Sequence, residues 1–440
     1  MCSRPSVSRE LTVFITCLEP AATASRLLGL ETFTITTVVQ EDGSFMIVFK
    51  RSIRVTVYTV TIVIVMLSTF VIFLYRSLNE KVHFAGSVIE MSQIIIWANT
   101  TIASSVVLIV MCLNNRPRQE ILHRFMTVDK ILVGKAGERY RKWSKSSKLF
   151  LMCGFLMITI ASGFYLLVFD GLVLNLMMYV GYVRDLIIVT MVASYVNVVL
   201  LVRQRYILLN THLYDIFHKE QAENFRAHRR NISEHPYLLH PERLKDLMTN
   251  IQGLRNTAPN TSYLSCTENI LAVRIVYNSL SHIVSLINSS CGVLVLFTIF
   301  SGFIQSIFSL FVTLTFTSTL SEMNHNFYSK GMIAILFLST AIYVSEAMLI
   351  IWVRSSTARA ARITGDIVQD LLLKPGIDEE ARVQLKEFSD QISSKELVFT
   401  AADFFTLDLS IIPSMAGHSY PMSLVSCSLI LSYKSSQHVA

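Results

Sequence analysis

Long apolar stretches, separated by polar segments, run through most of the chain. A helix needs about 20 mainly apolar residues to cross a hydrocarbon core that is roughly 30 Å thick. Seven stretches have this character and are predicted to span a membrane: residues 55–75, 91–113, 149–169, 186–202, 292–316, 331–353 and 409–433. The pattern therefore predicts an all-α polytopic membrane protein with seven transmembrane helices, the first six of them within residues 55–353.

Two of the seven stretches are less regular than the others. The fourth is short, and the apolar residues 171–183 precede it across Arg184 and Asp185, so the pattern leaves the outer end of this helix open. The seventh contains Pro413 and Pro421, and each proline removes a backbone hydrogen-bond donor that a membrane helix needs.

The composition agrees with a membrane protein. Hydrophobic residues make up 52% of the chain and charged residues only 16%, which lies outside the range of soluble globular domains. A pI of about 9.0 can indicate nucleic-acid binding, but here the basic residues flank membrane spans, where they set orientation and meet anionic lipid headgroups. We therefore expect membrane lipid as a partner and no nucleic acid.

Four polar segments hold most of the positive charge. Residues 1–54, 114–148, 203–291 and 354–398 contain 33 of the 38 Lys and Arg residues. Positive charge resists translocation, so these segments are assigned to the cytoplasm, and they alternate with short outer loops. The N-terminal segment is then cytoplasmic, the C-terminus is extracellular, and residues 434–440 form an extracellular tail.

Apolar residues recur at helical spacing in two of the cytoplasmic segments. The stripe before the fifth span consists of Val273, Val276, Tyr277, Leu280, Ile283, Val284 and Ile287. The second, within residues 378–392, consists of Ala381, Leu385, Phe388 and Ile392. Asp378 can cap the second helix. These stripes fit either a packed helical domain below the membrane or helices that lie on the inner leaflet.

Enzymatic chemistry has no support in the sequence. The chain contains no Gly-x-Ser-x-Gly, Cys-x-x-Cys, His-Glu-x-x-His or P-loop motif. His235 and His240 share a polar cytoplasmic segment but have no partners that would complete a metal site. We expect a protein that is not an enzyme and that has no cofactor and no metal.

Several short patches carry a resemblance to a known family. They are Leu27-Leu28-Gly29-Leu30, then Leu280, Ile287-Asn288 and Gly292, then Leu385, Phe388-Ser389 and Gln391-Ile392, and finally Leu397-Val398-Phe399-Thr400-Ala401-Ala402 and Phe404-Phe405-Thr406-Leu407-Asp408. Together with the chain length and the cytoplasmic N-terminus, these patches resemble insect gustatory receptors, a family related to insect odorant receptors.

The resemblance implies a function as well as a fold. Such receptors are ligand-gated, nonselective cation channels that assemble as homo- or hetero-tetramers in the plasma membrane of chemosensory neurons. Residues 409–433 would line the pore, and the cytoplasmic helices within 354–408 would form an anchor between subunits. A small-molecule tastant would bind in the outer half of the helical bundle. A bitter-type receptor is the default expectation, since sugar, fructose and carbon dioxide receptors share this architecture.

The last span departs from the family pattern. Family members end with a Thr-Tyr pair, five apolar residues and Gln-Phe. Here Ser419 and Tyr420 stand for the first pair, whereas Ser426 and Cys427 occupy the positions of the second, and Pro421 follows the tyrosine directly. The resemblance makes Ser419 and Tyr420 candidate pore or gate residues.

Three acids are further candidates for the pore. Burying a charge in lipid costs several kcal/mol unless the charge is paired or hydrated, so acids in or near spans mark functional positions. Glu346 lies in the inner half of the sixth span, and Asp403 and Asp408 lie at the start of the seventh. The three would line the inner mouth of a cation pathway. Alternatively, Glu346 pairs with Arg354 or with a cytoplasmic lysine.

Aromatic residues near the outer ends of the spans are candidates for ligand contact, because small-molecule sites are apolar with a few polar groups. They are Trp97, Phe164, Tyr165, Tyr179, Tyr182 and Phe337. Each of them also fits the role of an interfacial anchor. Arg184 and Asp185, at the outer end of the predicted fourth span, either form structural contacts or gate access to the pocket.

Two other classes of membrane protein remain as alternatives. A secondary transporter would show internal repeats with matched broken helices, and no such repeat is found. A seven-helix G-protein-coupled receptor would have the opposite orientation, an Asp-Arg-Tyr motif after the third span and an Asn-Pro-x-x-Tyr motif in the seventh, and both motifs are absent.

Overall fold

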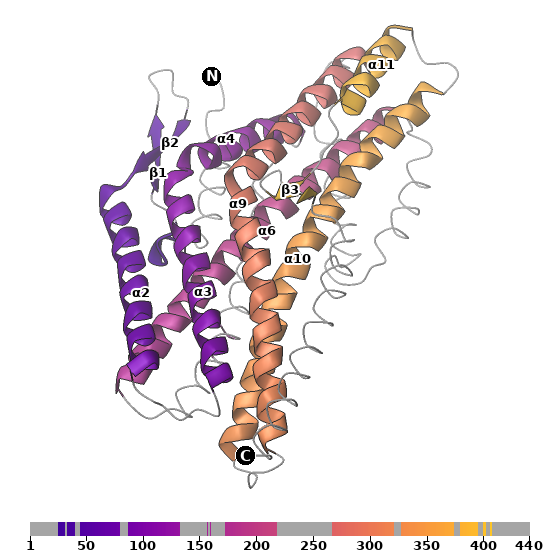
Figure 1. Ribbon diagram of the computed structural model, residues 1–440. Helices are drawn as coiled ribbons and strands as arrows, with labels where there is room; N and C mark the ends of the chain where they lie inside the picture. The colour runs from indigo at the N-terminus through magenta and orange to yellow at the C-terminus, as the bar shows by residue number, and fades with distance from the viewer. Residues whose placement is uncertain are drawn as a thin grey trace.

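Long helices make up most of the described chain in the computed structural model, which describes residues 25–30, 33–39, 45–79, 87–132, 156, 159, 172–217, 266–320, 327–373, 379–394, 399–401 and 405–406. The helices are α2 (Ile53–Asn79), α3 (Ser87–Leu113), α4 (Asn115–Leu132), α6 (Leu172–Phe217), α9 (Cys266–Leu320), α10 (Phe327–Leu372) and α11 (Glu379–Ser394) (Figure 1). The predicted all-helical membrane fold is confirmed.

Four of the described helices are long and apolar enough to cross a membrane: Ile53–Asn79, Met91–Leu113, Tyr179–Tyr214 and Asn269–Thr313. They correspond to the first, second, fourth and fifth predicted spans, and α10 covers the sixth. Apart from residues 156 and 159, the predicted third span lies outside the described residues, as does the predicted seventh.

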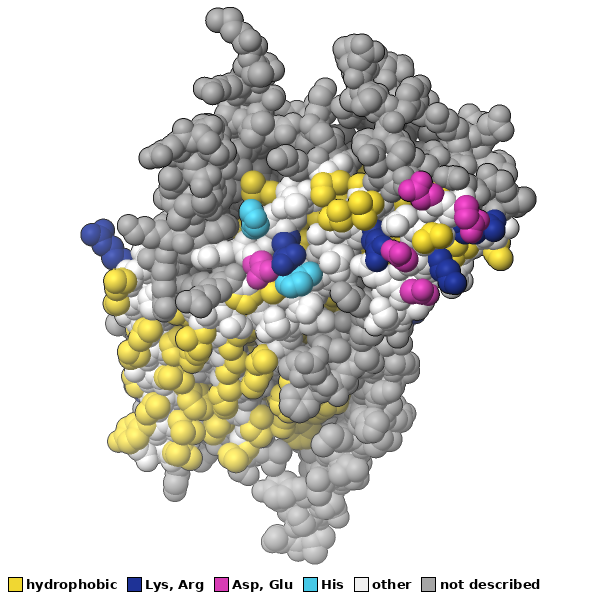
Figure 2. Space-filling model, turned by 90° about the horizontal axis from the view of Figure 1, so that it is seen from above, with side chains coloured by type: hydrophobic (Ala, Val, Ile, Leu, Met, Phe, Trp, Pro, Cys, Tyr) yellow, Lys and Arg dark blue, Asp and Glu magenta, His cyan; other side chains and the backbone are white. Residues whose placement is uncertain are grey.

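The centre of the bundle is formed by α3, α6, α9 and α10, and α2 lies at its edge (Figure 1). The apolar window of α6 is 78% buried inside the molecule, whereas that of α2 is only 17% buried. Apolar residues such as Val57, Ile64 and Val71 are therefore left on the outside of α2, where lipid can cover them. Seen from the α4 and α11 end, a broad hydrophobic surface covers one side, and charged side chains gather over the end itself (Figure 2).

The predicted cytoplasmic helices are present, and they pack against one another. The stripe before the fifth span belongs to α9, and each of its seven residues is at most 2% exposed. The second stripe belongs to α11, which packs against α9 and α10, with Ala381, Leu385 and Phe388 buried. The packed arrangement therefore applies to these helices. Asp378, the predicted cap, lies outside the described residues.

Three aromatic rings join the helices at this cytoplasmic junction. The rings of Tyr206 on α6 and Tyr277 on α9 meet edge to face with centroids 5.8 Å apart, and those of Tyr277 and Phe388 on α11 do so at 5.4 Å. Such aromatic pairs contribute about 0.5–1.5 kcal/mol each beyond the area they bury. The contacts hold α6, α9 and α11 in one register.

A buried ion pair joins α4 to α6 in the same region and was not predicted. Asp129 accepts two hydrogen bonds from Arg205, at 2.6 Å to Nε and 2.8 Å to Nη2. Both side chains are 2% exposed. The bidentate geometry satisfies both charges at once, which a buried pair requires if it is to offset the loss of hydration.

The short segment that ends Leu27-Leu28-Gly29-Leu30 is attached to α2. Gly29 has a positive φ of 75°, a conformation that side chains with a Cβ rarely adopt. Its carbonyl accepts a hydrogen bond from Thr59 at 2.9 Å, and the carbonyl of Leu27 accepts one from Tyr58 at 2.8 Å. Leu30 is fully buried, whereas Leu27 is exposed.

Two small antiparallel sheets were not predicted. Strand β1 (Phe33–Val39) pairs with β2 (Phe45–Arg51), with Phe33 opposite Arg51, and β3 (Thr400–Ala401) pairs with β4 (Phe405–Thr406). The sequence FTITTVV of β1 is rich in β-branched residues, which favour strands. That signal was available, but a short strand is specified mainly by its partner, and local sequence does not identify the partner.

Candidate functional site

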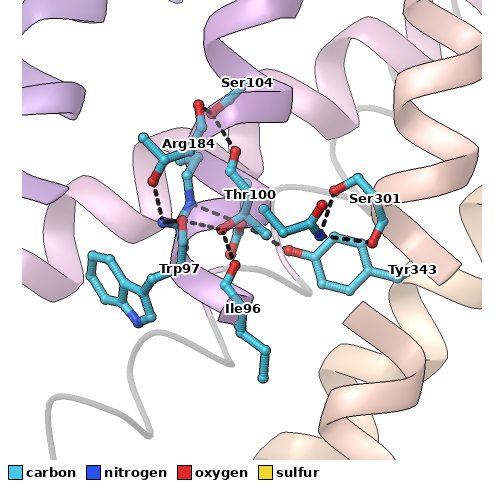
Figure 3. A network of polar contacts seen from close by, with 10 residues as sticks. Ile96, Trp97, Thr100, Ser104, Arg184, Ser301 and Tyr343 are labelled. Atoms are coloured by element: carbon cyan, nitrogen blue, oxygen red, sulfur yellow. Dashed lines mark hydrogen bonds and ion pairs between the residues drawn. The ribbon is translucent and has the colours of Figure 1, made fainter. Parts of the chain in front are cut away.

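A group of polar side chains crosses the centre of the bundle and is called the polar layer here (Figure 3). Its members are Asn99, Thr100, Thr101 and Ser104 on α3, Arg184 and Asp185 on α6, Ser301 on α9, and Tyr343 on α10. All four helices are apolar at this depth, so each polar group needs a partner inside the protein.

The helices α3 and α9 are joined by an amide. The side-chain nitrogen of Asn99 donates to the backbone oxygen and to the hydroxyl of Ser301, each at 3.0 Å. The hydroxyls of Thr100 and Ser104 donate back to carbonyls of their own helix, at 2.9 Å to Ile96 and 2.7 Å to Thr100. Asn99 therefore provides the polar contact between α3 and α9, whereas the hydroxyls of Thr100 and Ser104 donate their hydrogen bonds within α3.

The guanidinium of Arg184 connects α6 to α3. Its Nη1 donates to the hydroxyl of Thr101 at 3.1 Å and to the carbonyl of Trp97 at 3.5 Å. The charged group also lies 4.7 Å from the centroid of the Trp97 ring, which stacks on Phe73 with centroids 4.8 Å apart. A cation over an aromatic face gains about 0.5–2 kcal/mol, more as water is excluded. Arg184 is only 6% exposed.

The neighbouring carboxylate connects α6 to α10. The hydroxyl of Tyr343 donates to Oδ1 of Asp185 at 3.0 Å, and Tyr343 itself is 8% exposed. Arg184 and Asp185 form only a loose pair, with Nε 3.9 Å from Oδ1. Within the described residues, the Nε of Arg184 is buried and has no hydrogen-bond partner. The layer thus holds a charged pair whose hydrogen bonding is incomplete.

The pattern left the outer end of the fourth span open, and the structure extends this helix beyond Arg184 and Asp185. Helix α6 begins at Leu172, twelve residues before Arg184, which corresponds to about 18 Å of helix. The two residues therefore lie beside Thr101 and Tyr343, near the middle of the second and sixth spans. Arg184 is buried there, whereas the side chain of Asp185 is 37% exposed. A charged pair looks like a boundary in a hydropathy pattern, although here partners on α3 and α10 hold it within one continuous helix.

The structure separates the predicted ligand contacts into groups. Trp97 touches the polar layer, as described above. Tyr179 and Tyr182 are neighbours on α6, with ring centroids 6.5 Å apart, and the Tyr182 hydroxyl shares a hydrogen bond of 3.2 Å with Thr159. Tyr179 and Phe337 are more than half exposed, which agrees with contact to lipid or to another subunit. Phe164 and Tyr165 lie outside the described residues.

Of the predicted pore residues, Glu346 is the one that the structure describes. It lies one helical turn from Tyr343 on α10 and is 8% exposed. Among the described residues it forms no ion pair with Arg354. That arginine instead donates to the hydroxyl of Tyr195 and lies over its ring, at 4.9 Å from the centroid. Asp403, Asp408, Ser419 and Tyr420 lie outside the described residues, so the proposed grouping at the pore stays a prediction.

Several residues of the layer were not anticipated, namely Asn99, Thr101, Ser301 and Tyr343. A usable signal existed, because polar residues repeat at one-turn intervals inside otherwise apolar spans. On α9, Ser301, Gln305 and Ser309 follow each other at i+4 spacing and are each at most 6% exposed. Such a spacing shows that the residues share a face, but not which neighbouring helix the face contacts.

Comparison with known proteins agrees with this architecture. A solved insect olfactory receptor, OR5 from Machilis hrabei, is similar with a TM-score of 0.58 and 11% sequence identity, over 93% of this chain and 96% of that chain. The same receptor in complex with eugenol gives a TM-score of 0.56 and 12% identity, over 94% and 97% of the two chains. No match is found among curated proteins.

The likeness to the olfactory receptor concerns the fold, because so low an identity carries no assignment of ligand or function. The family is shown instead by a model built from many sequences. The model of the 7tm chemosensory receptor family matches residues 18–419, which includes every described residue of the bundle. The chain therefore belongs to the 7tm chemosensory receptor family.

Proposed function

We propose that the chain is a gustatory receptor that works as a ligand-gated, nonselective cation channel in the plasma membrane of chemosensory neurons. Family membership supports a receptor rather than an enzyme. The patches that resemble insect gustatory receptors support the taste assignment, with a bitter-type small molecule as the default ligand. Assembly as a homo- or hetero-tetramer follows from the same resemblance.

The observation that carries the proposal is the polar layer. Charged side chains inside a membrane bundle are costly, and they are retained mainly where they serve a ligand, an ion or a moving part. Here Arg184 and Asp185 sit between the aromatic ring of Trp97 and the hydroxyl of Tyr343, and their mutual contact is loose. Apolar walls with a few convergent polar groups are typical of small-molecule sites.

The layer is well placed to transmit a change in ligand occupancy. Helix α10 carries Tyr343 and continues without a break to Leu372, where it packs against α11. A ligand that alters the contact between Tyr343 and Asp185 would shift α10 against α6. That shift would reach the cytoplasmic helices, which lead to the predicted pore span. Rigid helices are able to transmit such shifts because packed interfaces deform little.

The direct test is electrical. The chain would be expressed alone and together with a related receptor in cells that lack chemoreceptors, and a panel of bitter compounds would be applied under voltage clamp. We expect reversible cation currents with unitary openings that persist when G-protein signalling is blocked. Substrate-coupled current without unitary openings would support a secondary transporter instead. A response that requires G proteins would support a G-protein-coupled receptor.

A single hydroxyl tests whether the layer takes part in ligand response. Tyr343→Phe removes the hydrogen bond to Asp185 and leaves the ring in place. Hydrogen bonds to charged groups are worth about 1.5–3 kcal/mol, so we expect the half-activating ligand concentration to change by roughly tenfold or more. The measurement is a dose–response curve of the evoked current.

Tyr58→Phe is the matched control for this substitution. Its hydroxyl also donates a hydrogen bond, but to the carbonyl of Leu27 at the cytoplasmic end of α2. We expect Tyr58→Phe to leave the half-activating concentration unchanged. Equal shifts in both variants, or no shift in Tyr343→Phe, would count against a role of the polar layer in ligand response.

A further inference from the structure

The membrane spans contain very few positive charges. None of the seven predicted spans includes a lysine or an arginine. Among the described residues, the buried basic side chains are Arg184 in the polar layer, and Arg205 and Arg354 nearer the cytoplasmic junction. The guanidinium of Arg354 lies over the rings of Tyr195 and Phe399, at 4.9 and 5.7 Å. Any further acid at the depth of the layer therefore lacks an obvious cation.

Glu346 is such an acid. It lies three residues after Tyr343 on α10, so the two side chains share a face of that helix. Tyr343 already donates to Asp185, which places a second carboxylate at the same site, within electrostatic range of Glu346. Among the described residues, no donor or cation reaches the carboxyl of Glu346, although this residue is 8% exposed. The region thus holds two carboxylates and one guanidinium, and of these carboxylates the guanidinium contacts only that of Asp185.

A second, independent group on α9 also lacks a partner. The side-chain oxygen of Gln305 is buried without a hydrogen bond among the described residues, and Gln305 is 6% exposed. Ser301 faces Asn99 on α3. Gly302 lies against α10, because a Cβ added to this glycine would be 3.5 Å from the carbonyl oxygen of Tyr343. At 100° per residue, Gln305 projects between these two directions, on the face of α9 between α3 and α10 and one helical turn from Ser301.

Two of the unsatisfied groups around the layer share one chemistry, whereas the buried Nε of Arg184 is a donor. The Glu346 carboxyl and the Gln305 oxygen are acceptors, and the charges described there sum to one excess negative charge if both acids are ionised. A buried charge without a partner costs several kcal/mol, and a buried acceptor without a donor also destabilises the protein. A bound molecule that brings N–H donors and a positive charge would correct both deficits.

We propose that the ligand of this receptor is an organic ammonium ion, whose charged nitrogen is held by Glu346 and the Asp185–Tyr343 pair and whose N–H groups reach the oxygen of Gln305. The inference rests on the proposed function, since it assigns a chemical class to the ligand of the polar layer. The apolar body of the ligand would lie toward Trp97, whose ring packs against the guanidinium of Arg184. Glu346 then determines specificity by charge.

Binding can be tested separately from channel activity. The full-length receptor, purified in lipid nanodiscs, would be titrated with ammonium compounds from phenethylamine to N,N-dimethylphenethylamine, each of which carries at least one N–H group when protonated. Each would be compared with a neutral isostere, 2-phenylethanol for phenethylamine, and with the anion 3-phenylpropionate. Ligand-dependent thermal stabilisation reports affinity, because a ligand that binds only the folded state raises the unfolding temperature. We expect the ammonium form to bind about tenfold more tightly than its isostere, the factor that 1.4 kcal/mol produces.

Variants then assign the preference to one side chain. Glu346→Gln keeps the shape and removes the charge, and we expect it to abolish the preference for the ammonium form. Glu120→Gln is the matched control, because Glu120 is an exposed acid on α4 that pairs with Arg124 at 2.8 Å. The control variant is expected to keep the preference in full. Size-exclusion profiles check that both variants fold.

Three results would overturn the inference. They are equal or tighter binding of the neutral isosteres, an ammonium preference that survives Glu346→Gln, and no stabilisation by any ammonium compound. A change of ion selectivity in Glu346→Gln with an unaltered ammonium response would place Glu346 on the ion path instead. Failure of the proposed function has a different signature, because ammonium ions would then bind selectively but evoke no current.

Discussion

Two arginine–aspartate pairs in the same bundle have opposite geometries. At the cytoplasmic junction, Arg205 and Asp129 form two short hydrogen bonds, and both side chains are 2% exposed. In the polar layer, Arg184 and Asp185 approach only to 3.9 Å and rely on other helices for their hydrogen bonds. The same chemical groups thus form a closed contact in one region and an open one in the other.

The surroundings of the two pairs extend this contrast only in part. Near the junction, Asn210 donates to the carbonyl of Ala360 at 2.9 Å and accepts from Thr364 at 2.6 Å, so its polar atoms on both sides are satisfied within α6 and α10. The Nε of Arg184 in the layer and the buried oxygen of Gln305, one turn from Ser301 on α9, have no hydrogen-bond partner among the described residues. The hydroxyl of Tyr206 at the junction is also buried without a hydrogen-bond partner among the described residues, so the contrast concerns the two ion pairs themselves. A charged pair with complete hydrogen bonding resists rearrangement, whereas a loosely paired one can accept a ligand.

The largest effect is expected when the closed pair is broken. Asp129→Ala leaves Arg205 charged and buried without its carboxylate. Breaking a buried pair in this way costs about 3–5 kcal/mol, so we expect a large fall in the thermal unfolding temperature and in surface expression. Replacing both partners, as in Asp129→Leu with Arg205→Met, should recover much of that loss. A loss below about 1 kcal/mol in the single variant would contradict the closed description.

A smaller effect on stability is expected at the open pair. Arg184→Ala removes a guanidinium that is only loosely bound to Asp185, and Asp185 keeps the hydrogen bond from Tyr343. We expect a loss of about 1–2 kcal/mol, mainly from the hydrogen bond to Thr101 and the contact with the Trp97 ring. Thermal unfolding measured side by side with Asp129→Ala gives the comparison. Equal losses would remove the distinction between the regions.

The smallest effect is expected at a contact on the surface of the cytoplasmic helices. Arg274 on α9 donates to Glu387 at 2.5 Å and to Gln391 at 2.7 Å, both on α11, and the Glu387 side chain is half exposed. Such pairs contribute about 0.2–1 kcal/mol and are screened by salt. Glu387→Gln should therefore lower stability slightly at low ionic strength and hardly at all at 1 M salt. A large, salt-independent loss would show that the junction depends on this ion pair.

Much of the helical framework could be read from the sequence. The stripes of α9 and α11 follow from the 3.6-residue period, because a face that repeats at this spacing is buried only if another helix covers it. The register of those helices was not readable, and it depends on contacts such as that between Tyr277 and Phe388, which are 111 positions apart in the chain. The two small sheets were missed for the same reason, since strand pairing is non-local.

The site was predicted less completely than the framework. Trp97 was identified because aromatic residues stand out in an apolar span, and it does touch the polar layer. The sequence did not identify Tyr343, Asn99 and Ser301 as site residues, because a single polar residue in a span gives no sign of which helix it contacts. Arg184 was placed at the end of the fourth span, since a charge usually marks the end of an apolar stretch.

The sequence by itself determined that the chain is a membrane protein built of helices, and it indicated where most of those helices lie. Apolar length and periodicity are local properties, and the hydrocarbon core demands them of any chain that crosses it. Only the tertiary structure decided which polar groups meet inside the bundle, because Thr101, Arg184 and Tyr343 come from three separate helices. The distinction between a closed junction and an open polar layer depends on distances between such helices, and hydropathy carries no information about those distances.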